Sequence, residues 1–554
     1  MEYKKNTEIE LDITDISNEG EGIGKSDGFP FFVKDALPGD RILASVTKAK
    51  KNYAYARLVR IISPSRDRVE ACCPIARSCG GCRLQELDYG AQLAFKERKV
   101  KNDIIRLGGV PQDILDKAFE GIDGMEVPFR YRNKAQYPFG RDRNGNIIYG
   151  FYAGRTHEIK SCDDCLLSSP DDHAILEVIK GWLLSEKLSP YDEKTGRGLL
   201  RHVLIRRAFS SGAVMVCLVV NSKELPHRDV LIKRLTGMGK NITSVSYSEN
   251  TERTNVIMGK NYHTIYGTDT IRDSIGGLSF EISPLSFYQV NPFQTEKLYS
   301  HALEFAALKG KETVWDLYCG IGTISLFLAS KAGMVCGVEI VPQAIEDAKK
   351  NALINHIDKV QFFTGAAETV LPEYYSTVDA STELLHPDVI VVDPPRKGCD
   401  EKCLETMVKM QPDRIVYVSC DPATLSRDIK YLRANNYELR RLHIVDMFPQ
   451  SVHVETVVLL GDKRVDGHIN IDLDVEKLES KGGKATYAEI KDYVKEKYGL
   501  SVSSLYIAQI KDKVGLDKRL NYNHGTGKTD GRPLVCPPEK EEAIMDAFRH
   551  FNLI

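Results

Sequence analysis

A cysteine stands at the end of an apolar stretch in RIVYVSCDPATLSRD, which begins at Arg414. Residues 415–418 have the composition of a buried strand, and Ser419, Cys420 and an Asp-Pro turn follow directly. Cysteine usually acts as a small buried hydrophobic residue, and position alone favours that interpretation of Cys420. Where a strand runs into a loop, a cysteine can instead be a nucleophile that faces a cleft. Other motifs in the chain must decide between the two interpretations.

A second group of reactive side chains lies earlier, where six of the thirteen cysteines stand close together in the sequence: Cys72, Cys73, Cys79, Cys82, Cys162 and Cys165. Three of them, Cys73, Cys79 and Cys82, have C-x5-C-x2-C spacing, and Cys165 or Cys162 would complete a set of four thiolates. Such a density favours a metal site over packing or disulfides in an intracellular chain. Zinc and iron–sulfur clusters both accept four thiolates, so the spacing leaves the metal open.

The stretch TVWDLYCGIGT reads as a strand followed by a glycine-rich turn. Gly320 and Gly322 let the backbone approach a ligand, and Glu339 follows about twenty residues later, where a carboxylate can hold ribose hydroxyls. The full GxGxxG pattern is absent, which weighs against a pyrophosphate cofactor. Asp316 before the turn, and Asp393 at a strand end in VVDPPRKG, suit S-adenosylmethionine instead. We therefore expect a methyltransferase rather than a dehydrogenase.

A methyltransferase sheet would give Cys420 a chemical task if the methyl acceptor were an sp2 carbon such as uracil C5. Addition of the Cys420 sulfur to C6 would make C5 enolate-like and able to attack a sulfonium methyl group. The C5 proton must then leave to a base, and SVHVETVVLL supplies His453 and Glu455 as candidates. A surface imidazole and a structural carboxylate are the alternative interpretations of these two residues.

The elements that must position these side chains fall into four regions. Short alternating strands separated by Gly-rich turns predict an OB-like β-barrel, and a mixed α+β region with the cysteines follows it. Nearly continuous apolar strands between amphipathic helices then predict a doubly wound, Rossmann-like parallel sheet. The last part is mostly helical, compatible with a helix-turn-helix, a winged helix or a docking bundle. The expected multidomain α/β boundaries are 1–65, 66–287, 288–463 and 464–554.

Two basic and aromatic stretches indicate nucleic-acid contact. TKAKKNYAYARLVRIISPSRDR interleaves Tyr53 and Tyr55 with lysines and arginines, although a solvated edge strand is the alternative. FRYRNKAQYPFGRDR carries Asn133, Lys134 and Gln136, which could contact an RNA loop, and a surface hairpin fits the stretch nearly as well. The formal net charge of the chain is only −2, so any such surface must be local.

The composition is that of an ordinary globular protein, with 42% hydrophobic and 27% charged residues. There is no apolar run long enough to cross a membrane, and the first residues lack an apolar signal core. We expect a cytoplasmic monomer with no membrane partner.

Taken together, the motifs resemble the RNA uracil-C5-methyltransferase family, most closely its 23S rRNA (uracil-5-)-methyltransferases with an N-terminal TRAM domain. The likeness covers about residues 1–463 and rests on motifs that occur in the family's order: EGIG, ALPGD, CPIARSCGGC, SFYQVNPFQ, DLYCGIGT, VVDPPRKG, VSCDPATLSRD and DMFPQSVHVE. The tail after residue 463 lies outside this pattern.

The resemblance implies a site and two cofactors. The family's nucleophile falls on Cys420 and its general base on Glu455. Its S-adenosylmethionine contacts fall on Gln289, Tyr318, the loop from Gly320 to Thr323, Glu339 and Asp393. Its [4Fe-4S] ligands fall on Cys73, Cys79, Cys82 and Cys165, with Cys72 and Cys162 as extra neighbours. Ala366 stands where relatives often have a polar side chain near the adenine, so only a backbone contact is expected there.

Three activities compete at this stage. The leading one is S-adenosylmethionine-dependent synthesis of 5-methyluridine in RNA, with 23S rRNA favoured over tRNA only through the resemblance. An iron–sulfur or nucleotide-linked oxidoreductase would explain the cysteines and the glycine turn but would leave Cys420 and Glu455 without a task. An RNA-binding assembly factor whose methylation is incidental would tolerate replacement of Cys420.

Overall fold

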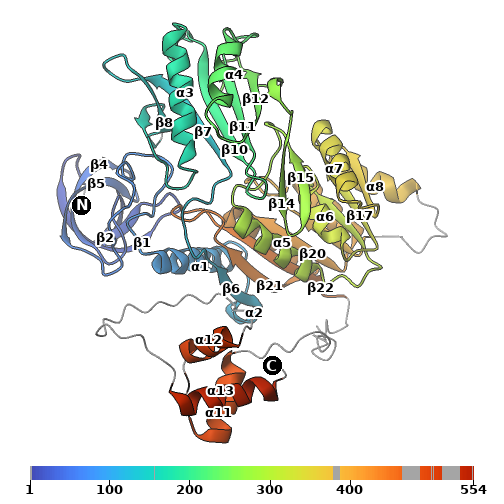
Figure 1. Ribbon diagram of the computed structural model, residues 1–554. Coiled ribbons are helices and arrows are strands. Elements are labelled where there is room, and N and C mark those ends of the chain that lie inside the picture. Colours follow the sequence, from blue (N-terminus) through green and yellow to red (C-terminus); the bar gives the residue numbers. More distant parts are fainter. Residues whose placement is uncertain are drawn as a thin grey trace. The chain divides into compact units, whose positions relative to one another are not determined.

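The computed structural model describes residues 3–154, 156–377, 387–464, 487–500, 502, 504–514, 537–551 and 553. The chain divides into two compact units, Met1–Val465 and Asp466–Ile554. In its described part, the first unit holds a closed barrel and sheets of seven, two and eight strands (Figure 1). No helix of the described residues is long and apolar enough to cross a membrane.

The N-terminal barrel is confirmed as a closed five-stranded structure with strand order β1-β2-β3-β5-β4. Alternate residues of its strands point inward, which is why Phe31 and Val33 of one strand are both fully buried. Pairing of the first strand with the fourth closes the barrel. Its strands are β1 Glu8–Ile16, β2 Gly22–Ser26, β3 Phe29–Lys34, β4 Arg41–Ala49 and β5 Ala54–Ser63.

The seven-stranded sheet has the order β13-β12-β11-β10-β7-β8-β9. It is formed by β7 Lys134–Arg141, β8 Ile147–Tyr152, β9 Ile159–Ser161, β10 Leu200–Arg207, β11 Val214–Val220, β12 Ile242–Glu249 and β13 Tyr262–Gly267. Helices α3 (Asp171–Ser185) and α4 (Arg228–Thr236) pack on one face (Figure 1). The sequence predicts a run of antiparallel strands here, but β11 and β12 are parallel. The reason is α4, which carries the chain back to the starting edge before β12 begins.

The eight-stranded sheet has the order β18-β17-β16-β19-β20-β22-β21-β6. Its strands are β6 Phe119–Asp123, β16 Thr313–Leu317, β17 Met334–Glu339, β18 Val360–Thr364, β19 Val389–Val392, β20 Arg414–Ser419, β21 Tyr437–Val445 and β22 Glu455–Asp462. The predicted parallel strands β16 to β20 form one half, whereas β22 runs antiparallel to both of its neighbours. The edge strand β6 comes from the region before the seven-stranded sheet and pairs with β21.

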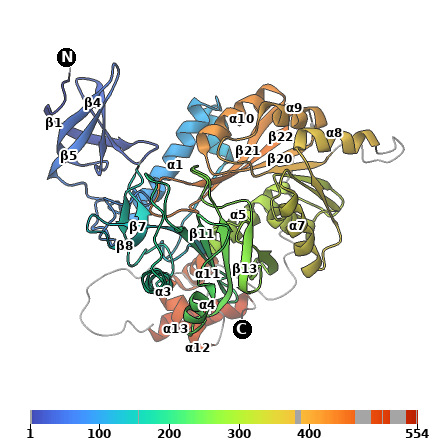
Figure 2. The same cartoon turned by 90° about the horizontal axis from the view of Figure 1, so that it is seen from above.

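Helices cover both faces of the eight-stranded sheet, as Figure 2 shows for α5 and α10. One face packs against α5 Pro292–Ala306, α6 Thr323–Ala329 and α7 Pro342–Ile354, and the hairpin β14 Ile271–Ile275 with β15 Leu278–Ile282 also joins this core. The other face packs against α1 Tyr89–Arg106, α2 Gln112–Ala118, α8 Ala367–Thr377, α9 Glu401–Met410 and α10 Pro422–Ala434. Because both faces are covered, the central strands are apolar at consecutive positions.

The second unit contains α11 Tyr487–Tyr498, α12 Ser504–Lys513 and α13 Pro538–His550. These helices lie where the sequence predicts helices, and their own core includes Ile490, Ile507 and Phe548. The stretch NYNHGTGKTDGRPL, which the sequence reading places before the last helix, lies outside the described residues.

Candidate active site

A cavity of about 630 Å³ opens where β16, β17, β19 and β20 end. Open α/β sheets bind ligands at this edge because the loops after parallel strands converge there. Most of the predicted site residues line it: Gln289, Tyr318, Gly320, Glu339, Asp393, Cys420 and Glu455. Thr323 lies instead on a smaller adjoining cavity of about 50 Å³, together with Asp316, Tyr318, Gly320 and Asp393.

The turn after β16 has an unusual backbone. Tyr318, Gly320 and Gly322 all have positive φ angles, of 71°, 55° and 82°. That conformation is costly for a tyrosine, which makes Tyr318 a strained residue within the glycine turn. The amide groups of Tyr318 and Cys319 both donate to the carbonyl of Val338, which ties the turn to β17. The turn therefore presents a fixed backbone surface to the cavity.

Glu339 ends β17, as the sequence predicts, and its carboxylate is held by the backbone. Oε2 accepts from the amide of Gly320 at 3.3 Å and Oε1 from the amide of Val341 at 2.9 Å. These bonds fix the carboxylate beside the glycine turn. The side chain is thus preorganised to accept hydrogen bonds from a ligand's hydroxyl groups.

A buried carboxyl group, Asp316, and a half-buried one, Asp393, flank this turn. Burial raises the pKa of both Asp316 and Asp393 to about 7. Oδ2 of Asp316 accepts from the Ser325 hydroxyl at 2.5 Å, whereas its Oδ1 is buried with no partner in the described structure. An unpartnered buried oxygen is costly, so it marks a position that a donor or cation would satisfy.

Cys420 lies between β20 and α10, two strands from β16, as expected. Its backbone is fixed on both sides. Asp421 caps α10 by accepting from the amides of Ala423 and Thr424, and the carbonyl of Ser419 accepts from the Thr456 hydroxyl at 3.1 Å. Burial raises the pKa of the Cys420 thiol to about 12, with Glu455 and Asp393 raising it and Arg396 lowering it.

Glu455 begins β22 and is 2% exposed. Its pKa is raised well above the usual range, first by burial and then by the charge of Asp393, while Arg396 opposes the shift. Its Oε2 has no hydrogen-bond partner among the described residues. His453, the other candidate base, is not among the residues lining this cavity, and burial lowers its pKa to about 4.

Several cavity residues have only weak sequence signals. Arg396 belongs to VVDPPRKG but is not singled out by any spacing, and Phe287 and Phe448 read as ordinary aromatics until the fold places them on the cavity wall. Ala366 also lines it and offers no polar side-chain atom, as the sequence indicates.

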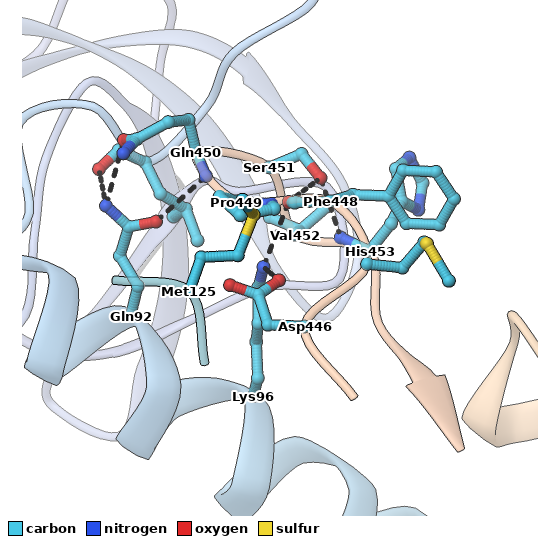
Figure 3. A network of polar contacts seen from close by, with 12 residues as sticks. Gln92, Lys96, Met125, Asp446, Phe448, Pro449, Gln450, Ser451, Val452 and His453 are labelled. Carbon is cyan, nitrogen blue, oxygen red and sulfur yellow. Dashed lines mark hydrogen bonds and ion pairs between the residues drawn. The ribbon is translucent and has the colours of Figure 1, made fainter. Parts of the chain in front are cut away.

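The Phe448 loop depends on contacts that the sequence does not reveal (Figure 3). Lys96 of α1 places Nζ 2.5 Å from Oδ1 of Asp446 and donates to the carbonyl of Phe448 at 3.1 Å. Gln92 of α1 exchanges two hydrogen bonds with Gln450. A helix from the beginning of the chain therefore fixes the segment between β21 and Glu455.

The four predicted cluster cysteines lie close enough to influence one another's charge. Cys165 raises the pKa of Cys73, Cys79 and Cys82, although burial is the largest cause in each case. Burial, and then Cys165, Cys73 and Cys79, raise the pKa of Cys162, whereas Cys72 is exposed. Gly80 sits tightly against β8: its amide donates to the carbonyl of Tyr152, and a Cβ atom would lie 2.8 Å from that oxygen.

The fold and site define the class of protein: an enzyme with a methyltransferase fold joined to a small barrel. Residues 240–463 match the family model described as tRNA (Uracil-5-)-methyltransferase, and residues 3–59 match the TRAM domain. A protein of Clostridium tetani, named an uncharacterized RNA methyltransferase, is 46% identical over 83% of this chain and 98% of its own. A similarly named protein of Halalkalibacterium halodurans is 46% identical over 82% of this chain and 97% of its own.

Among solved structures, the tRNA (uracil-54, C5)-methyltransferase of Pyrococcus abyssi in complex with S-adenosyl-L-homocysteine is 26% identical, with a TM-score of 0.64. It covers 82% of this chain and 100% of its own. The chain belongs to the RNA (uracil-5-)-methyltransferase family. The predicted family and the predicted enzyme class are confirmed.

Proposed function

We propose that the protein transfers a methyl group from S-adenosylmethionine to C5 of a uridine in 23S rRNA, through a covalent adduct between Cys420 and C6. The observation that carries the proposal is one cavity shared by a cysteine, Cys420, and a buried carboxyl group, Glu455, beside a glycine turn. We expect the enzyme to act as a cytoplasmic monomer.

The residues around the glycine turn fit the cofactor. Glu339 would hold the ribose hydroxyls, while Gln289, Tyr318, Gly320 and Thr323 would surround the rest of the molecule. The unpartnered Oδ1 of Asp316 offers an acceptor for a cationic amino group. The bound cofactor supplies an electrophilic methyl group on a sulfonium.

A positive sulfonium suits the charges of this cavity. Burial raises the pKa of the Cys420 thiol most, and Glu455 and Asp393 raise it further, because each carboxylate disfavours a nearby thiolate. A cation placed among these groups would oppose the effect of the two carboxylates and favour the thiolate. Cofactor binding would thus prepare the nucleophile.

The proposed reaction begins when the Cys420 thiolate adds to C6 of a uracil that has left the RNA stack. Electron density moves to C5, which would bond to the methyl carbon of the donor while the methyl–sulfur bond breaks, so that the sulfonium leaves as a neutral thioether. Glu455 then takes the C5 proton, the C5–C6 double bond re-forms and the thiolate leaves. Asp393 lines the same cavity, where it would border both the cofactor and the acceptor and orient the base.

We assign Cys73, Cys79, Cys82 and Cys165 as ligands of a [4Fe-4S] cluster. Zinc and a [4Fe-4S] cluster both accept four thiolates, and the resemblance of CPIARSCGGC to the family's cluster motif is what favours the cluster. Arg132 lies beside these cysteines, and its buried Nε has no partner in the described structure. Burial lowers the pKa of its guanidinium, but nearby groups that include Cys165 and Cys82 raise it above the usual range.

The test is mass-spectrometric mapping of 5-methyluridine in rRNA and tRNA, separated, from a strain lacking the protein. Loss of one 23S rRNA site, restored by the wild-type chain but not by Cys420→Ala, is expected. Loss confined to tRNA would identify the second candidate substrate, which the Pyrococcus abyssi structure favours. Unchanged 5-methyluridine in both fractions would refute the proposal.

A further inference from the structure

A second cavity, of about 520 Å³, lies beside the cysteine loop and away from the active site. Its walls come from Gly80, from β8 and the loop after it, from the start of β10, and from residues 254–257. Its volume falls within the usual range for small-molecule sites. None of the chemistry proposed above uses it.

The walls of this second cavity combine flat rings with polar atoms. The rings of Tyr152 and His157 meet edge to face, with centroids 5.3 Å apart, and His157 is exposed. His202 is 5% exposed; its Nε2 lies 3.4 Å from the Tyr152 hydroxyl, and its Nδ1 has no partner among the described residues. Aromatic rings together with an unsatisfied ring nitrogen are what an unstacked nucleobase requires.

Arg201 adds a fixed positive charge to the same wall. It is 4% exposed, and its Nη1 donates to the carbonyls of Asn250 and Glu252 at 3.0 and 2.7 Å. Its guanidinium carbon also lies 4.5 Å above the ring of Tyr191. Because these contacts hold the Arg201 side chain in place, its charge stays next to the cavity. Glu193 also lines the cavity, and its Oε1 lies 3.8 Å from Nη2 of Arg201.

Strand β10 connects this second cavity with the active site. His202 lies near its start, and Arg206 lies four residues later on the same face, about 13 Å along the strand. Arg206 donates to the carbonyl of Ser286, the residue before Phe287 of the active-site cavity. The next residue, Arg207, bonds through its amide to the carbonyl of Asn133, whose Nδ2 donates to the Gln289 carbonyl.

Two neighbouring cations, Arg206 of β10 and Lys134 of β7, lack acidic partners in the described structure. Nε and Nη1 of Arg206 are buried without a hydrogen-bond partner. Lys134, opposite Arg206 in the ladder, has its pKa lowered to about 8 by burial and by the charge of Arg206. Arg206 is 1% exposed whereas Lys134 is half-buried, so only the charge of Lys134 reaches the surface, where it suits a phosphate of an RNA strand that passes between the cavities.

We propose that the cavity at His202 binds a second unpaired nucleobase of the same RNA, a few nucleotides from the uridine at Cys420. The inference rests on the proposed function for the identity of the first base. Tyr152 and His157 provide stacking surface, and His202 contacts the base edge. Lys134 neutralises a phosphate in between.

Ultraviolet cross-linking tests the proposal in the Cys420→Ala protein, so that binding is read without methyl transfer. The probe is total RNA from a strain that lacks the protein. After nuclease and trypsin digestion, mass spectrometry should find nucleotide adducts on the peptide 144–155, which holds Tyr152, or on the peptide 156–160, which holds His157, in addition to adducts near Phe287 or Phe448. Adducts near Phe287 or Phe448 without any at residues 152–157 or 254–257 would overturn the inference.

Affinity for the same RNA provides the second measurement. His157→Ala, which changes an exposed side chain, and His202→Phe, which keeps a ring but removes the nitrogens, should each weaken binding about tenfold. His356→Asn is the control, since His356 is an exposed histidine with positive φ that lines neither cavity. Unchanged affinity in His157→Ala and His202→Phe would also overturn the inference.

The two proposals can fail separately. Adducts at residues 152–157 with no 5-methyluridine depending on the protein would leave the second base site standing and refute the proposed methylation. Protein-dependent 5-methyluridine without those adducts would support the proposed methylation and refute the second base site.

Discussion

Lys96 Nζ and Asp446 Oδ1 lie 2.5 Å apart, with both side chains fully buried, although 350 positions separate them in the chain. The lysine comes from α1, and the aspartate is the first residue after β21. Lys96 also donates to the Phe448 carbonyl, so the pair holds one wall of the active-site cavity in place. A buried pair of this kind contributes specificity more than net stability.

Removing the lysine alone should therefore be severe. Lys96→Met leaves the Asp446 carboxylate buried without its cation, which should lower the free energy of unfolding by about 3–5 kcal/mol. Urea denaturation followed by circular dichroism measures this loss. The control is Lys101→Met on the same helix, where a partly exposed pair with Glu97 should cost less than about 1 kcal/mol. Equal losses in the two variants would contradict the assignment.

Variants of the two proposed catalytic residues should differ in kind. Cys420→Ala should bind RNA and S-adenosylmethionine but form neither adduct nor product. Glu455→Gln should add and methylate but stall before elimination, because a neutral amide cannot take the proton. A denaturing gel with labelled methyl donor should then show a slow protein–RNA band only for Glu455→Gln. A band from Cys420→Ala, or normal turnover by Glu455→Gln, would reverse the assignment.

The reactivity of Cys420 should depend on cofactor charge. Its thiol pKa is raised to about 12, so the free enzyme should react with iodoacetamide slowly at pH 8 and faster as the pH rises. A bound sulfonium stabilises the thiolate, so S-adenosylmethionine should shift the profile to lower pH. S-adenosylhomocysteine, whose sulfur is uncharged, controls for access to the cavity. Mass spectrometry of the modified Cys420 measures the reaction rate at each pH. Identical dependence of that rate on pH with the two ligands would argue against electrostatic activation.

The iron–sulfur cluster proposed at the four cysteines should both colour the protein and stabilise its fold. We expect a brown protein that loses its visible absorption and its solubility in Cys79→Ser or Cys82→Ser, because metal binding contributes folding free energy. Cys72→Ser is the matched control, since Cys72 is exposed and is not one of the assigned ligands. A colourless, zinc-containing wild type purified without oxygen would exclude the iron–sulfur assignment.

The barrel should supply part of the electrostatic binding of RNA. The side chains of Lys50, Lys51 and Arg57 are exposed. They lie near the aromatic rings of Phe32 and Tyr53, whose centroids are 5.5 Å apart. Replacing all three cations with alanine should weaken RNA binding and flatten its dependence on salt. S-adenosylmethionine binding, measured by thermal shift, should not change. Replacement of Lys309 and Lys311, which line neither of the two larger cavities, is the control. An unaltered salt slope would show that the barrel does not contact phosphates.

Much of the architecture follows from periodicity in the sequence. Alternating strands separated by Gly-rich turns specify a barrel whose inward positions, such as Phe31 and Val33, must be apolar. Strands with consecutive apolar residues, such as 389–392, can be predicted from the sequence because helices cover both faces of their sheet. The glycine turn and Glu339 are also readable, since their chemistry depends on spacing along one strand–turn–helix unit.

Other features needed the tertiary structure. Strand β6 joins the eight-stranded sheet through pairing with β21, more than three hundred residues away, and its own short sequence carries no sign of that partner. The parallel pairing of β11 with β12 likewise depends on the path of α4 rather than on strand composition.

The same division holds within the site. Sequence determined that Cys420 ends a buried strand and that an acidic residue follows in DMFPQSVHVE, because both facts are local. Only the fold decided that Glu455, and not His453, lines the cavity with Cys420, through the antiparallel register that pairs Ser419 with Thr456. The supporting contact between Lys96 and Asp446 was likewise invisible, because burial and charge pairing across 350 positions arise only when distant segments pack together.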